Sequence, residues 1–153
     1  MSRLAILTLV VAAACTDEGP PVDDIPDATT LPIEVLGAPG VAVAATIDVP
    51  RVIAEEREVA LELVVSNVVA ANAAFVSING GTPIDLGADA SHLRRPSGGT
   101  ASSAIALPAG AVRAGVNRLV FSYERQVPDV SGFRVIGAAI AAGRERAAVA
   151  LPE

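Results

Sequence analysis

Hydrophobic and polar residues alternate along much of the chain after residue 40. In residues 58–67, apolar side chains recur at every second position from Val59 to Val65. A period of two is typical of a β-strand that buries one face. This pattern, or a run of small and β-branched residues, predicts strands over residues 41–49, 58–67, 73–79, 82–87, 102–108, 117–125 and 132–140.

A tight hairpin is indicated at Asn79-Gly80-Gly81, because Asn and Gly accept the positive φ angles of a primed turn. Two segments also fit a helix by propensity, residues 53–65 and the alanine-rich residues 138–153. Clean alternation favours a strand in the first segment. The second stays open between a strand and a short helix.

Short strands separated by Pro- and Gly-containing turns predict an all-β fold, specifically an antiparallel β-sandwich. The length of 153 residues suits one such domain. We place the sandwich over residues 41–142 and a solvated C-terminal tail over residues 143–153.

The N-terminus has the pattern of an export signal. The apolar run of residues 4–14 is about half the length that a membrane-spanning helix needs. The run ends in Ala12-Ala13-Ala14-Cys15, which resembles the lipobox of bacterial lipoproteins, with Ala12 where that family most often has Leu. The resemblance implies a signal peptide over residues 1–14 and a lipid on Cys15 that anchors the protein in the cell envelope, at the outer membrane. The alternative is an ordinary secretory peptide with a chance cysteine.

The lone cysteine and the segment after it fit an anchored protein. A single cysteine in an exported chain has no partner for an internal disulfide, so a modification would explain it. Residues 15–40 contain five prolines and six acidic residues without a basic residue. Such segments stay extended because they bury little apolar surface. We therefore expect residues 15–40 to be the lipidated cysteine and its tether.

Composition narrows the function classes. The formal net charge is −6, and no nucleic acid partner is expected, because phosphate binding needs a clustered cationic face. With one His and one Cys, a multi-histidine metal site cannot be assembled, and a catalytic Ser/His/Asp or Cys/His set would depend on His92. We expect no metal, no cofactor and no enzymatic activity.

Two segments carry a resemblance in the middle of the chain. A strand–turn–strand over residues 75–86 and a loop-to-strand stretch over residues 107–121 resemble the galactose-binding-like (jelly-roll) sandwich modules of exported proteins. The resemblance implies binding or spacing, and it transfers no sugar site. In the second segment, Gly115 suits a left-handed backbone, and Asn117 suits bridging of loop amides or carbonyls. An immunoglobulin- or fibronectin-like sandwich is the structural alternative, without the Cys pair and core Trp of immunoglobulin domains.

Aromatic side chains are scarce, and their spacing favours the core. Phe121 and Tyr123 lie two positions apart on one strand face, which indicates packing rather than a sugar platform. The longest segment without predicted structure, residues 87–100, is the candidate ligand-binding loop. It would hold an anionic group through its arginines, although a solvated loop is the favoured interpretation. Its candidate residues are Asp89, Ser91, His92, Arg94 and Arg95.

The sequence thus predicts a non-enzymatic, membrane-anchored lipoprotein that presents a small sandwich as a binding or structural module. Its partners would be the membrane, through Cys15, and a glycan or an envelope protein. Two alternatives stay open. One is a hydrolase accessory or weak enzyme that uses residues 87–100, and the other is a subunit of an envelope assembly that presents a sheet edge.

Overall fold

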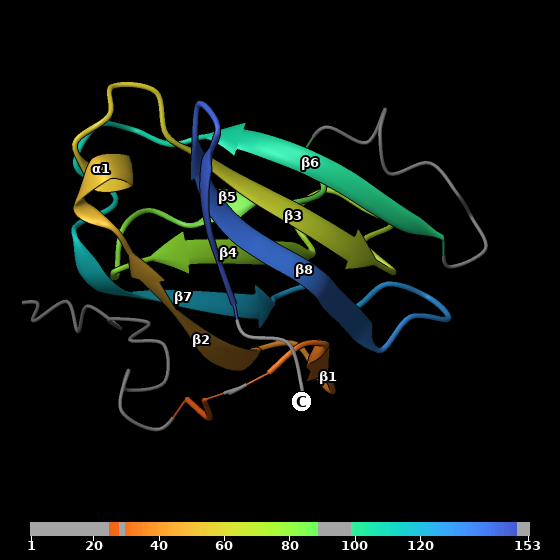
Figure 1. The fold of residues 1–153 in the computed structure, drawn as a ribbon. Coiled ribbons are helices and arrows are strands. Elements are labelled where there is room, and N and C mark those ends of the chain that lie inside the picture. The colour runs from red at the N-terminus through yellow and green to blue at the C-terminus, as the bar shows by residue number, and fades with distance from the viewer. Residues whose placement is uncertain (1–24, 28–29, 89–98, 150–153) are drawn as a thin grey trace, which may run out of the picture.

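The structure is a computed structural model that describes residues 25–27, 30–88 and 99–149. Within these residues, two antiparallel sheets pack against each other, and a single helical turn lies at one end (Figure 1). The elements are β1 (Ile33–Leu36), β2 (Val41–Val49), α1 (Arg51–Ala54), β3 (Ala60–Ser66), β4 (Ala74–Ile78), β5 (Ile84–Asp85), β6 (Thr100–Ala106), β7 (Gly115–Tyr123), β8 (Gly132–Ala142) and β9 (Glu145–Ala148).

The first sheet has five strands and the second has four. In the five-stranded sheet the order is β1-β8-β3-β6, and β9 also pairs with β8. Because β1 pairs with the first residues of β8 and β9 with the last, these two short strands share one side of β8. The other sheet has the order β2-β7-β4-β5. The predicted antiparallel β-sandwich is therefore confirmed.

The core lies between the sheets and follows the predicted alternation. In β3, Leu61, Leu63 and Val65 are buried. In β7, Phe121 and Tyr123 are buried on the inner face, which confirms that they belong to the core. Burial of large aliphatic and aromatic side chains contributes roughly 1.5–3 kcal/mol each, so the inner faces supply most of the driving force for this packing.

The predicted tether extends too far toward the domain. Ile33–Leu36 form β1, and Leu31, Ile33 and Val35 are buried in the core. The prediction of a tether through residue 40 is wrong for this strand. Prolines and acidic residues surround this strand, so the short alternation of apolar residues at 31, 33 and 35 was not recognised as a strand pattern.

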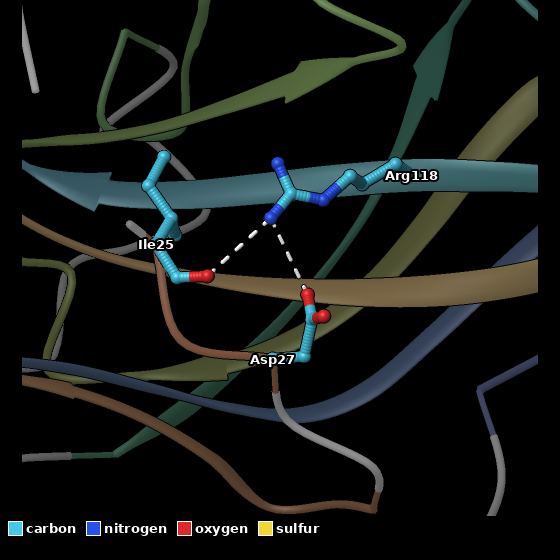
Figure 2. A network of polar contacts seen from close by, with 3 residues as sticks. All are labelled: Ile25, Asp27 and Arg118. Carbon is cyan, nitrogen blue, oxygen red and sulfur yellow. Dashed lines mark hydrogen bonds and ion pairs between the residues drawn. The ribbon is translucent and has the colours of Figure 1, made fainter. Parts of the chain in front are cut away.

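The tether also contacts the sandwich further upstream. The Ala44 N–H of β2 donates to the Pro26 carbonyl at 2.9 Å, and Asp27 forms a parallel bridge with Ala44. Arg118 of β7 lies within 3.3 Å of the Asp27 carboxylate and within 3.4 Å of the Ile25 carbonyl (Figure 2). Residues 25–27 thus lie along the outer edge of β2.

The C-terminal segment is a strand rather than a solvated tail. The chain turns at Gly143, where φ is +58°, and β9 pairs back onto β8. Ala147 and Val149 are buried. The prediction of a solvated tail from residue 143 is wrong for this strand. The segment contains many small residues, so its alternation of apolar and polar positions is weak.

The other ambiguous segment divides into two elements. The helix is one turn, Arg51–Ala54, which follows Pro50 and buries Ile53. The strand interpretation is confirmed from Ala60 onward. The hairpin prediction is also confirmed, with φ of +52° at Asn79 and +72° at Gly80, although its return strand β5 has only two residues.

Candidate functional site

The outer face of the five-stranded sheet carries a groove of about 520 Å³. We call it the outer groove. It runs over β3, β6, β8 and β9. A second hollow of about 530 Å³ continues it over β3, β6 and β8 and shares Glu62 and Ala104 with it. The outward-facing positions that line the outer groove are Glu62, Val64, Ser102, Ala104, Gly137, Ala139 and Ala148.

The strand register determines which residues meet in the outer groove. Val64 lies between Ser102 on one side and Gly137 on the other. A Cβ added to Gly137 would lie 3.3 Å from Cγ2 of Val64, so the glycine makes room for this valine. Glu62 lies between Ala104 and Ala139 in the same way. The small residues of β6 and β8 thus flank the larger Glu62 and Val64 of β3 on this face.

Charged side chains at the outer groove pair with each other. Glu62 of β3 forms an ion pair with Arg146 of β9, across the alanines of β8. Glu34 and Arg134 form a second ion pair, at 2.9 Å, further along the same face. Because these side chains are well exposed, such pairs contribute little to stability, and their effect is to neutralise the surface beside the groove.

The described residues hold few groups for catalysis. Among them, no cluster of three or more His, Cys, Asp or Glu side chains is placed to hold a metal ion. The polar side chains that face the outer groove are Glu62, already paired, and Ser102. The groove is therefore suited to binding through shape, apolar contact and backbone groups.

The aromatic rings do not line the outer groove. Phe121, Tyr123 and Phe133 are buried, and Phe75 lies half-buried on β4 of the other sheet. The Tyr123 hydroxyl accepts a bond from the Val127 N–H at 3.0 Å and donates to the Val130 carbonyl at 3.1 Å, which fixes the turn before β8. Stacking of a sugar ring in the groove would therefore lack a platform.

A polar network holds the start of β7, as the sequence predicted for Gly115 and Asn117. Gly115 has φ of +87°. Asn117 is fully buried, and its amide donates to the carbonyls of Arg113 (2.6 Å) and Gly115 (2.8 Å). Its Oδ1 accepts from the Arg113 N–H at 2.9 Å and from the Asn79 side chain at 2.8 Å. The link to Asn79 was not predicted, since 38 residues separate the two asparagines.

The structure does not test the predicted site residues. Cys15 and the loop residues Asp89, Ser91, His92, Arg94 and Arg95 lie outside the residues that the structure describes. The outer groove was in turn missed by sequence reasoning. Its signal was the run of Ala and Ser in residues 101–106, which alternation assigns to a strand without saying which strands lie beside it.

Two general observations complete the description. Over the described residues, no helix has the length and apolar character to cross a membrane. In comparisons with known proteins, no family model, no curated protein and no solved structure matches the chain.

Proposed function

We propose that the protein is a non-enzymatic, lipid-anchored protein of the cell envelope whose β-sandwich presents the outer groove to a protein partner. The observation that carries the proposal is the groove itself, in which Val64 and the small residues of β6 and β8 form an apolar surface whose one carboxylate, Glu62, is paired with Arg146. Surfaces of this kind on a sheet bind another polypeptide through shape complementarity and backbone contact.

A protein partner fits this surface better than a glycan. Sugar-binding faces use aromatic rings, and the three rings of Phe121, Tyr123 and Phe133 are buried. Specific sugar recognition also needs several convergent polar groups, whereas the outer groove offers one serine hydroxyl, that of Ser102, and a carboxylate already paired with Arg146.

Anchoring through Cys15 would hold the domain near the membrane. Because residues 25–27 contact β2 and Arg118, only ten residues, 15–24, separate the anchor from the folded domain. A chain of that length spans at most about 35 Å. Mass spectrometry of the mature N-terminus tests this part: we expect an acylated Cys15, and an unmodified thiol would refute it.

Site-specific crosslinking tests the binding surface. A photoreactive residue replaces Ala104 in the outer groove or, as the matched control, exposed Thr46 on the other sheet. In intact envelopes we expect a discrete protein adduct at position 104 and none at position 46. Equal labelling at both positions, or none at 104, would contradict a partner on this face.

A further inference from the structure

The edges of the two sheets are protected unequally. Along β2, the outer edge is covered by Pro26 and Asp27. The strands β1 and β9 have four residues each, and both carry a charge in a cross-strand ion pair. The last strand of the second sheet, β5, has two residues. Short strands, charges and covering segments are the devices by which proteins keep sheet edges from pairing.

The β6 edge has none of these devices among the described residues. Its seven residues, Thr100–Ala106, include no charge and no proline. It pairs with β3 on one side, and no described strand pairs with its other side. A sheet edge of this length leaves a row of backbone N–H and C=O groups available to another strand.

We propose that β6 pairs antiparallel with β6 of a second copy of the chain and joins the two five-stranded sheets into one continuous sheet. The proposal rests on the edge alone and holds whether or not Cys15 is lipidated. In the two-fold register centred on Ser103, residue 102 of one copy faces residue 104 of the other. Residues that face outward then meet outward-facing residues, so the outer grooves of the two copies become neighbours.

The side chains of β6 suit pairing with themselves. In this register Ser102 meets Ala104, Ala101 meets Ile105, and Thr100 meets Ala106. No like charges oppose each other, and the small side chains leave no steric obstacle. A chain with a net charge of −6 would otherwise repel its copy, so an uncharged edge is where two copies approach most easily.

A second copy would also complete the core beside β6. Ala101 and Ile105 pack against the hydrophobic core yet remain partly exposed. In the proposed register, Ala101 of each copy lies beside Ile105 of the other copy, so both side chains become covered. Because the described residues of each copy offer one such edge, the contact is isologous and closes at a dimer rather than continuing into a fibre.

The size of the contact predicts a weak dimer. A single strand pair is smaller than the roughly 20–30 residues a side of a stable interface. We therefore expect dissociation constants in the micromolar range or above. Confinement of both copies to one membrane would favour the dimer by raising their effective concentration.

Sedimentation equilibrium on residues 16–153 tests the proposal. Every strand and buried residue that the structure describes lies between Ile25 and Val149, so this chain retains all of them. From about 10 μM to about 1 mM, a range that covers weak association, we expect a reversible monomer–dimer equilibrium. The double variant Ser102→Lys/Ala104→Lys places lysines opposite lysines, and we expect at least tenfold weaker association.

A charge-reversed partner separates edge pairing from misfolding. The variant Ser102→Glu/Ala104→Glu should also be monomeric, but mixing it with the lysine variant should restore a mixed dimer, because each lysine then faces a glutamate. The control Val69→Lys/Val116→Lys adds the same charge at exposed positions outside β6 and should dimerise like the parent chain. Far-ultraviolet circular dichroism checks that each variant is folded.

The outcomes decide the proposal in either direction. A mixed dimer from two folded, monomeric variants supports pairing through β6. A parent chain that stays monomeric at about 1 mM, far above the range expected for specific dimers, would overturn the second copy as the occupant of this edge, even if another peptide later proved to bind there. A dimer unaffected by the lysine variant would place the contact elsewhere and also overturn the proposal.

Discussion

The β2 edge and the β6 edge show two ways in which a sheet can end. At β2, the Ala44 N–H that points away from β7 is bonded to the Pro26 carbonyl, and Arg118 holds Asp27 beside it. At β6, no described residue supplies such a cover. One edge is therefore covered by residues 26–27 of the chain itself, whereas no described strand pairs with the other.

This difference shows that the sequence of a strand does not by itself decide whether the edge of that strand is covered. Both strands are rich in small and β-branched residues, and neither contains lysine or arginine. What closes β2 is a contact between Asp27 and Arg118, which are 91 residues apart in the chain. Substitutions beside and away from these two edges test the contrast between them.

Gly132→Ala should have the largest effect, because it would uncover a second edge. A Cβ at this position would lie 2.0 Å from the Val35 carbonyl oxygen, and φ is +129°. The strand β1 cannot then pair with β8, so we expect a loss of about 3 kcal/mol or more in the free energy of unfolding, measured with urea.

Gly110→Ala is the matched control for this prediction. Gly110 also has a positive φ, +80°, but nothing lies within 4 Å of an added Cβ. Only backbone strain remains, which costs about 1–2 kcal/mol. Equal losses in the two variants would mean that the close approach of β1 to β8 at Gly132 contributes nothing.

Asn117→Ala should have an intermediate effect and leave both edges unchanged. The substitution removes four hydrogen bonds, among them three part-buried bonds to backbone groups of Arg113 and Gly115. We expect a loss of about 2–3 kcal/mol in urea unfolding. The control Gln126→Ala, which removes an exposed 3.4 Å bond, should change stability by less than about 0.5 kcal/mol.

The dimer affinity of the Asn117→Ala variant distinguishes association through β6 from association that depends on overall stability. Asn117 lies at the start of β7, inside the second sheet, and β6 belongs to the first. The folded Asn117→Ala protein should therefore dimerise as the parent chain does, when measured well below its unfolding midpoint. A parallel loss of dimer would show that association depends on overall stability rather than on β6.

Asp27→Asn should have the smallest effect on stability and a local effect on β2. The ion pair with Arg118 is partly exposed, so its loss should cost less than about 1 kcal/mol. We expect several-fold faster hydrogen exchange at the Ala44 amide, because the segment that covers it detaches more often. The control Glu55→Gln breaks the exposed pair with Arg51 and should leave the exchange rate of the Ala44 amide unchanged. An unchanged rate in Asp27→Asn would show that the ion pair does not hold the covering segment.

The sequence predicted the fold class and most strands because their inner faces carry strong alternation. The strand over residues 41–49 was predicted to the residue, and the roles of Gly115 and Asn117 were recognised from residue type and position. The short strands β1 and β9 were missed, since four residues among prolines, acids or alanines give too little periodicity.

The candidate surface was harder to predict than the fold. Ser102, Ala104 and Gly137 become one groove only when β6, β3 and β8 lie side by side, and strand order is not encoded in local pattern. Whether the edge of β6 is paired likewise depends on which strands lie beside it. Only the topology shows that β6 is the last strand of its sheet.

Hydrogen exchange at two protein concentrations tests the central contrast most directly. At about 10 μM and about 1 mM, which bracket weak association, the amides of Thr100–Ala106 that point away from β3 should exchange more slowly at the higher concentration. The Ala44 amide in β2 is already bonded and should exchange equally at both. Protection in β6 that does not depend on concentration, or an equal change in β2 and β6, would contradict the account.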